Sequence, residues 1–170
     1  KIRARQVFDS RGNPTIEAEV HSKKLSASAI CPSGASTGTH EAFEKRDTKN
    51  KKYLGKSVFS AINLINTKIS KKLSGTNIHD QVRIDTTLIN LDGTRQKTNL
   101  GANAILAVSM AAKKLSAKIK NVPLYKTFLV KNKYRLPYPL MNIINGGAHA
   151  NNGLRIQEFM IRPDKAKSFS

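Results

Sequence analysis

The chain has 170 residues, of which 39% are hydrophobic and 24% are charged, values typical of globular proteins and not of disordered or fibrous ones. Lys and Arg number 30 against 11 Asp and Glu, a formal net charge of +19, so nucleic acid or an acidic partner is the first alternative to consider. The longest nearly apolar run, Ala104 to Ala112, is interrupted by Ser109 and falls short of the ~20 residues that a membrane span needs.

The positive charge is spread along the chain. Lysines supply most of it, as in the pairs Lys23-Lys24, Lys51-Lys52, Lys71-Lys72 and Lys113-Lys114. Aromatic residues make up only 6%, and they do not alternate with basic residues as in proteins that stack bases. We therefore expect no specific nucleic-acid partner. A solvated lysine-rich surface, or a charge balanced by an acidic remainder of a longer protein, explains the excess better.

The cysteine content and the first residues of the chain indicate in which cellular compartment the protein works. Cys31 is the single cysteine, so no intrachain disulfide can form, which suits a reducing cytoplasm. No basic-then-apolar signal segment opens the sequence. We expect a cytoplasmic protein.

The first third of the chain predicts three strands. Ile2 to Phe8 is the first, and Asp9 to Pro14 is dense in turn-forming residues. Thr15 to His21 alternates polar and apolar residues, the period of a half-buried strand. The alternation continues from Leu25 to Cys31 after a short connection at Lys23-Lys24. These segments predict a three-stranded antiparallel meander.

The middle of the chain predicts helices. An apolar stripe at spacings of three and four ends at Gly75, a candidate C-terminal cap; its members are Val58, Ile62, Ile65, Ile69 and Leu73. A weaker helical stretch from Ile78 to Leu91 stops at Asp92-Gly93. Asn103 to Lys120 is rich in alanine and carries lysines near its C-terminal end, where the helix dipole favours them.

The character of the sequence changes at Arg135 to Pro139, where two prolines around a tyrosine predict a stiff connector and a domain boundary. Leu140 to Ile144 then reads as a strand of the fully buried type. Asn145-Gly146-Gly147 predicts a tight turn, and Leu154 to Ile161 predicts a second strand.

Pro32 to Gly38 is a candidate ligand-binding loop. Its small, hydroxyl-bearing and glycine residues allow a backbone to approach a ligand closely. A plain flexible connector is the alternative. The spacing of a phosphate-binding P-loop is absent.

His149 is a second candidate, because it lies in a loop rich in glycine and asparagine after a predicted strand, where an imidazole can exchange protons near neutral pH. A solvent-exposed loop histidine is the alternative. His21, His40 and His79 offer less, and no His/Cys/Asp/Glu spacing resembles a zinc site.

Glu158 stands in a strand-like, largely apolar run, where a carboxylate is costly to bury unless it meets a proton, a cation or a metal. The alternative is an outward-facing charge paired with Arg155 or Arg162. Strict alternation places Gln157 and Glu158 on opposite faces, so both belong to one site only if the strand bulges or ends there.

Five motifs along the chain resemble, in the same order, those of the enolases: Asp9 to Thr15, Pro32 to Gly38, Leu100 to Leu106, Met141 to Gly147 with His149, and Gln157 to Ile161. They are spread over nearly the whole chain. The basic charge, a short connection at Lys23-Lys24 and a short stretch before Arg135 depart from the family pattern, but none of these departures touches a motif.

The resemblance implies a fold and a domain division. It implies an α+β N-terminal capping domain over residues 1–134, a three-stranded antiparallel meander followed by helices. Residues 135–170 are then the incomplete beginning of the C-terminal enolase-type β/α barrel.

It also implies an activity, the reversible glycolytic dehydration of 2-phospho-D-glycerate to phosphoenolpyruvate by a homodimer with two Mg²⁺ ions per active site. Ser36 matches the serine that ligates the second magnesium as its loop closes. His149 and Glu158 match substrate-pocket residues, and Gln157 matches a position assigned to substrate contact in bacterial members.

The other catalytic residues of the family, including the base lysine, the proton-donating glutamate and the carboxylates of the first magnesium, come later than Ser170. We therefore expect no catalytic residue in these 170 residues, and we expect a fragment that is inactive alone. Two classes stay open: an enolase whose activity belongs to the full-length parent, and a non-catalytic basic module that contacts nucleic acid or a protein partner. The Ser36 loop argues against a relative that acts on another acid.

Overall fold

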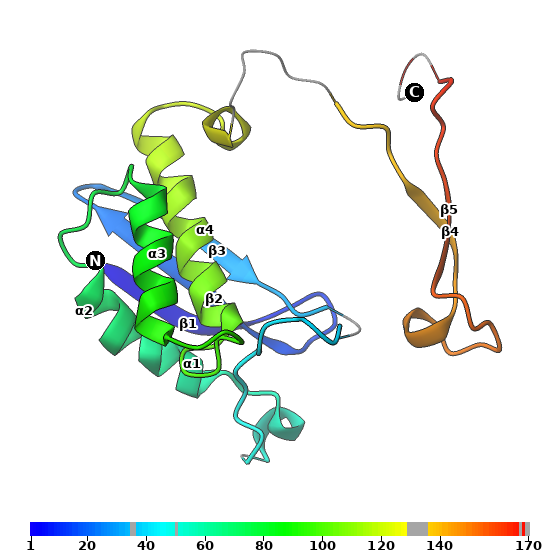
Figure 1. The fold of residues 1–170 in the computed structure, drawn as a ribbon, viewed down its shortest axis with the longest axis horizontal. Helices are drawn as coiled ribbons and strands as arrows, with labels where there is room; N and C mark the ends of the chain where they lie inside the picture. Colours follow the sequence, from blue (N-terminus) through cyan, green and yellow to red (C-terminus); the bar gives the residue numbers. More distant parts are fainter. Residues whose placement is uncertain (35–36, 50, 129–135, 167, 169–170) are drawn as a thin grey trace. The chain divides into compact units, whose positions relative to one another are not determined.

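The computed structural model describes residues 1–34, 37–49, 51–128, 136–166 and 168 (Figure 1). They belong to two compact units, of which the larger contains Lys1–Ser33 and the residues from Thr39 through Phe128. The smaller contains Gly34, Thr37, Gly38 and the described residues from Leu136 onward. The expected division between residues 134 and 135 falls outside the described residues.

The larger unit is built on the predicted meander. Strands β1 (Ile2–Phe8), β2 (Pro14–Ser22) and β3 (Leu25–Cys31) form an antiparallel sheet in the order β1-β2-β3. The turn between β1 and β2 is closed by Asp9, whose Oδ1 accepts hydrogen bonds from the backbone N–H groups of Arg11 at 2.9 Å and Asn13 at 2.8 Å. The three-stranded prediction is confirmed, turn included.

The predicted 58–73 helix is one helical stretch with a wider central turn. It consists of α1 (Phe59–Leu64), the π-helical segment η2 (Ile65–Ile69) and α2 (Ser70–Lys72), and it ends just before Gly75. All five residues of the predicted stripe are buried. The π-helical segment was not foreseen. Within it, the Asn66 side chain exchanges two hydrogen bonds with the backbone of Ala4 on edge strand β1.

The remaining helices lie close to their predicted positions. Helix α3 (Gln81–Asp92) begins three residues later than expected, because the Asp80 side chain caps it by accepting from the N–H of Arg83 at 3.0 Å. Helix α4 (Ala102–Ile119) packs on β2 and β3 (Figure 1). Two 3₁₀ turns, η1 (Lys52–Gly55) and η3 (Leu124–Phe128), complete the unit. No helix among the described residues is long and apolar enough to cross a membrane.

The core lies between the sheet and the helices. The side of α4 that faces β2 and β3 is made largely of alanines, so the helix axis can approach the sheet closely. The buried apolar residues of α4 are Ala104, Ile105, Ala107, Val108, Ala111, Ala112, Leu115 and Ala117. Ala18 and Ala29 of the sheet are also buried and belong to the same hydrophobic core.

The smaller unit is a hairpin whose second strand starts later than predicted. Strand β4 (Met141–Asn145) pairs antiparallel with β5 (Glu158–Ile161), with an irregularity between Asn142 and Ile144. Leu140 to Ile144 has the composition of a fully buried strand, but every residue of β4 is exposed in this chain. The strand predicted from Leu154 begins only at Glu158, because the carbonyls of Leu154 and Gln157 accept hydrogen bonds from Gly147 and Gly146 instead.

Asp92 anchors the connection between α3 and α4. Its side chain is buried, and its carboxylate accepts hydrogen bonds from the N–H of Leu100 at 2.7 Å, the N–H of Thr94 at 3.0 Å and the Thr94 hydroxyl. Burial raises the pKa of this carboxyl, but the hydrogen bonds from Leu100 and Thr94 and the charge of Lys97 outweigh it and hold the pKa below its ordinary value. The ionised form therefore stabilises the fold.

Replacing Asp92 with Asn should lower the free energy of unfolding at pH 7 by about 1–3 kcal/mol, because an amide offers one acceptor oxygen where the carboxylate offers two. The folded-state pKa lies below the unfolded value of about 3.9. The stabilisation is therefore present above that pH and is lost as the pH falls through the folded-state pKa. Urea denaturation of the parent and of Asp92→Asn at pH 7 and near pH 2.5 should show the difference between them shrinking in acid.

The control is Asp164→Asn, which removes the exposed ion pair of Asp164 with Arg162 and should change stability little. Equal stability of Asp92→Asn and the parent at pH 7 would contradict the anchoring role.

Candidate functional site

The glycine turn of the smaller unit brings segment 154–157 against the end of β4. The N–H of Gly146 donates to the Gln157 carbonyl at 3.0 Å, and the N–H of Gly147 donates to the Leu154 carbonyl at 2.8 Å. A Cβ on Gly146 would overlap the Ile156 carbonyl oxygen and lie 2.7 Å from the Cβ of Leu154. Only glycine fits there, and this close approach positions the residues that follow.

His149 is held between the two other predicted site residues. It ends the short 3₁₀ turn η4 (Gly147–His149), and its N–H donates to the Gly146 carbonyl at 3.0 Å. Its Nδ1 lies 2.9 Å from Oε1 of Glu158, and its Nε2 lies 2.8 Å from Nε2 of Gln157. The side chains of His149 and Glu158 are 23% and 30% exposed, so the cluster is partly shielded yet open to a ligand.

The contacts of the imidazole specify one tautomer. The Gln157 amide group donates to Nε2, which must then carry a lone pair, so Nδ1 carries the proton and donates it to the Glu158 carboxylate. A proton added at Nε2 requires the Gln157 amide to rotate and present its oxygen. The His149–Gln157–Glu158 cluster can therefore hold a proton at either ring nitrogen with one amide rotation.

The structure brings these three predicted residues together, although their assigned roles stay predictions. Gln157 immediately precedes β5, which begins at Glu158, so the strand end lets both side chains reach His149. The alternative pairing of Glu158 with an arginine is not found, since Glu158 pairs with His149 and Arg162 pairs with Asp164.

Ser36, the predicted metal ligand, lies outside the described residues. The structure does describe what holds the start of its loop. The guanidinium of Arg46 donates to Ser33 Oγ at 2.6 Å and to Glu44 Oε1 at 2.8 Å, and Ser33 Oγ donates to the same carboxylate oxygen at 2.5 Å. Arg46 also donates to the carbonyls of Pro14, at 3.0 Å, and Lys56. One arginine thus ties the loop base to the start of β2.

The Leu100 to Leu106 motif supports the same segment from the other side. The buried Asn103 side chain accepts from the Lys45 N–H at 3.1 Å and donates to the Lys45 carbonyl at 3.0 Å. A Cβ on Gly101 would lie 2.5 Å from the Cβ of Lys45, so glycine is needed for this approach. Sequence reasoning missed Glu44, Arg46 and Asn103. The polar Asn103 in an otherwise apolar first turn of α4 was the available signal.

The described residues contain no group of three His, Cys, Asp or Glu side chains that could hold a metal ion. Magnesium prefers several carboxylate and other oxygens, so these residues alone do not fit it. Cys31 is partly buried, and this burial, with the nearby charge of Glu44, raises the pKa of its thiol. It is a poor candidate for a nucleophile.

The fold defines an α+β domain followed by a two-stranded hairpin, and the family matches identify the class to which these two parts belong. Residues 1–128 match the family description "Enolase, N-terminal domain", and residues 133–170 match "Enolase, C-terminal TIM barrel domain". The chain belongs to the enolase family.

Named relatives agree with this assignment. Over all 170 residues the chain is 91% identical to the enolase of Pelagibacter ubique (strain HTCC1062), covering 41% of that protein. It is 52% identical over 169 residues to the enolases of Methanosarcina mazei and Methanosarcina acetivorans, covering 99% of this chain and 40% and 39% of theirs. The chain thus spans about two-fifths of the length of these relatives.

Gly146→Ala should break the His149–Gln157–Glu158 cluster, because the new methyl group overlaps backbone and forces segment 154–157 away from β4. Nuclear Overhauser contacts between the His149 ring and the side chain of Glu158 measure this directly. Gly153→Ala is the matched control, since a Cβ there meets no atom within 4 Å. Persistence of the His149–Glu158 contacts in Gly146→Ala would refute the close-approach explanation.

Proposed function

We propose that this chain is the N-terminal part of an enolase and that the whole protein reversibly dehydrates 2-phospho-D-glycerate to phosphoenolpyruvate. Family membership supports the proposal. The structural observation that carries it is the convergence of His149, Gln157 and Glu158 at the end of β4. The activity belongs to the whole protein, of which these residues supply a part.

The cluster suits a substrate that carries both anionic groups and a hydroxyl. The Gln157 amide has a second N–H that can donate to a carboxylate or phosphate oxygen, and the Glu158 carboxylate, which His149 orients, can accept a hydrogen bond from a hydroxyl. Such a combination orients a small phosphorylated hydroxy acid. We assign these three residues to substrate binding and none to proton abstraction.

The proposed cofactor is Mg²⁺, with two ions per active site and Ser36 as a ligand of one of them. Proton removal beside a carboxylate creates a doubly charged species, and bound magnesium stabilises such charge. The described residues hold no cluster that binds the ion. In the proposal its other ligands therefore come from the rest of the protein.

Three further assignments belong to this proposal. The capping domain extends over residues 1–134 and the barrel begins at residue 135. The whole protein is a homodimer, and it works in the cytoplasm. The family matches, which change from one domain to the other between residues 128 and 133, support the first assignment.

Residues 1–170 alone should not form phosphoenolpyruvate above background at saturating magnesium. The site residues proposed within them include neither a base that removes the proton nor the ligands of the first metal ion. A chimera in which these residues replace the corresponding part of the Pelagibacter ubique enolase should be active. Phosphoenolpyruvate absorbance, followed in protein free of host enolase, measures both.

Turnover by the 170-residue chain alone would show that the missing groups are misassigned. An inactive but folded chimera would refute the proposed function. It would favour the basic binding module instead if the chain also bound nucleic acid tightly at physiological salt.

In the same chimera, Ser36→Ala should lower turnover by roughly 10- to 1,000-fold, the range for loss of one electrostatic stabiliser, and should raise the magnesium concentration needed for half-maximal activity. Ser60→Ala, at an exposed position of α1, is the control and should leave both values unchanged. Unaltered magnesium dependence in Ser36→Ala would remove this residue from the metal site.

A further inference from the structure

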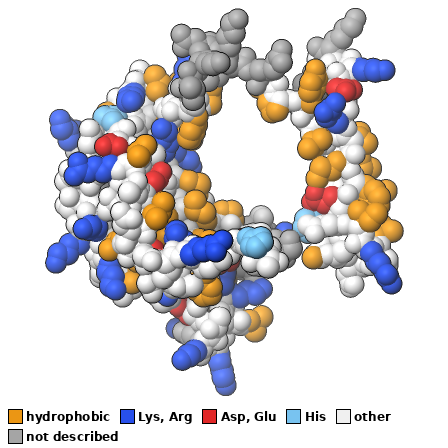
Figure 2. All heavy atoms as spheres, in the orientation of Figure 1, with side chains coloured by type: hydrophobic (Ala, Val, Ile, Leu, Met, Phe, Trp, Pro, Cys, Tyr) orange, Lys and Arg blue, Asp and Glu red, His pale blue; other side chains and the backbone are white. Residues whose placement is uncertain are grey.

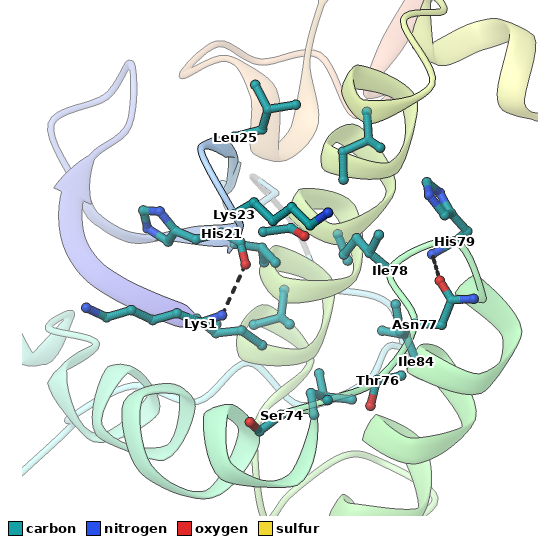
Figure 3. Close-up of a pocket in the computed structure, with 18 of the residues that line it drawn as sticks. Lys1, His21, Lys23, Leu25, Ser74, Thr76, Asn77, Ile78, His79 and Ile84 are labelled. Carbon is teal, nitrogen blue, oxygen red and sulfur yellow. Dashed lines mark hydrogen bonds between the residues drawn. The ribbon is translucent and has the colours of Figure 1, made fainter.

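The larger unit contains a cavity of about 1100 Å³ that the proposed reaction does not use (Figure 3). It lies where the β2–β3 turn, the C-terminal end of α2 and the loop before α3 meet. Strand β3 leads from this cavity to Cys31 and the loop base at Ser33, and its seven residues span roughly 20 Å. The cavity and the Ser33–Arg46 contacts therefore lie at opposite ends of the sheet.

The walls of the cavity are aliphatic and its rim is polar and basic. The floor and sides include Leu25, Ile78, Ile84, Val108, Ala112 and Ile119. The rim includes Lys23 and Lys24 together with hydroxyl-bearing residues such as Ser74 and Thr76. Among the described lining residues none is acidic and none is Phe, Tyr or Trp. The cavity thus combines apolar surface with positive charge.

Lys23 is the cation best placed to meet a ligand. Figure 3 shows its side chain reaching from the β2–β3 turn across the cavity, whereas the side chains of Lys1 and His21 point away. In the part of the chain that the structure describes, no carboxylate forms an ion pair with Lys23. Its charge is therefore available to a ligand.

The backbone at Lys23 supports this role independently. Its φ of 51° is in the left-handed region, where Gly and Asn are favoured and other residues pay a small conformational cost. A lysine at this turn position is therefore not explained by turn formation. We attribute the lysine at this position to the contact that its ammonium group can make with a ligand in the cavity.

Two further lysines beside β3 also favour a negatively charged ligand. Lys118 donates to the Ser26 carbonyl at 3.0 Å and Lys114 donates to the Ser28 carbonyl at 3.2 Å. These contacts hold two more ammonium groups beside β3, the strand that begins at the cavity. An anion is favoured here over a neutral ligand.

We propose that this cavity binds a free aliphatic carboxylate, with its hydrocarbon chain against the aliphatic walls and its carboxylate at the Lys23 ammonium. Lys23, whose side chain reaches across the cavity, offers its ammonium group to the carboxylate. The lack of Phe, Tyr and Trp among the described lining residues disfavours a nucleotide, whose base would gain most from stacking. The burial of methylene groups supplies affinity that a small inorganic anion lacks.

The test titrates sodium decanoate into the 170-residue chain by isothermal titration calorimetry, with the amide NMR spectrum recorded in parallel. Saturable binding should shift the amides of 20–25 and 73–79. Lys23→Asn should weaken binding about three- to tenfold without lowering the melting temperature, because Asn tolerates the left-handed backbone. Leu25→Ser should also weaken binding, because the hydrocarbon chain of decanoate loses an apolar contact. Lys49→Asn, which removes an exposed lysine outside the lining, should leave the affinity unchanged.

Four results would overturn the proposal: no saturable decanoate binding, equal weakening by Lys23→Asn and Lys49→Asn, decanol binding as tightly as decanoate, or binding confined to phosphatidylglycerol vesicles. If a short oligonucleotide or an acidic peptide of higher affinity displaced decanoate, that molecule and not an aliphatic carboxylate would be the ligand of the cavity. Loss of enolase activity in the chimera does not bear on this result, since binding is measured on the chain itself.

Discussion

The alanine face of α4 is the contact on which the larger unit depends. Because Ala104, Ala111 and their neighbours are small, the helix lies close against β2 and β3 and is buried along most of its length. Its N-terminal end then places Gly101 and Asn103 against Lys45. Its C-terminal half supplies part of the wall of the cavity. Larger side chains on this face would separate helix from sheet and move both regions.

The smaller unit is organised by backbone contacts and not by a core. Its hairpin is held by strand pairing and by the bonds of Gly146 and Gly147 to segment 154–157. Its apolar side chains, such as Ile143 and Phe159, are exposed. The match to a barrel domain accounts for them, since the neighbouring strands and helices of a barrel cover such faces. The His149–Gln157–Glu158 cluster forms without that cover because its contacts are local.

In a chain with a formal charge of +19, several of the 11 acidic side chains make specific structural contacts. Asp80 caps α3, Asp92 binds the α3–α4 connection, and Glu44 binds Arg46. Asp47 accepts from the N–H groups of Phe59 and Ser60 at the start of α1. Acidic side chains thus satisfy particular backbone or arginine donors. Many lysines, in contrast, are exposed, and Figure 2 shows basic side chains spread over the visible surface with few acidic ones among them.

The sequence by itself determined the elements and the family. Alternation with a period of two predicted the three strands, and the stripe from Val58 to Leu73 predicted a helix, because side-chain period is a local property of the backbone. The motifs identified His149, Gln157 and Glu158 as candidates. Their alternation left open whether Gln157 and Glu158 share a site, and the late start of β5 decided it.

Only the tertiary structure decided which groups meet across long stretches of chain. The pairing of Asn103 with Lys45, of Arg46 with Pro14 and of Asn66 with Ala4 joins residues 58, 32 and 62 positions apart. The exposure of the apolar run from Leu140 to Ile144 has a related reason. An apolar run indicates that a strand can be buried, whereas its actual burial requires other elements to pack on that strand. Hydrogen bonding and burial are properties of the neighbours in space, and residue spacing along the chain does not specify them.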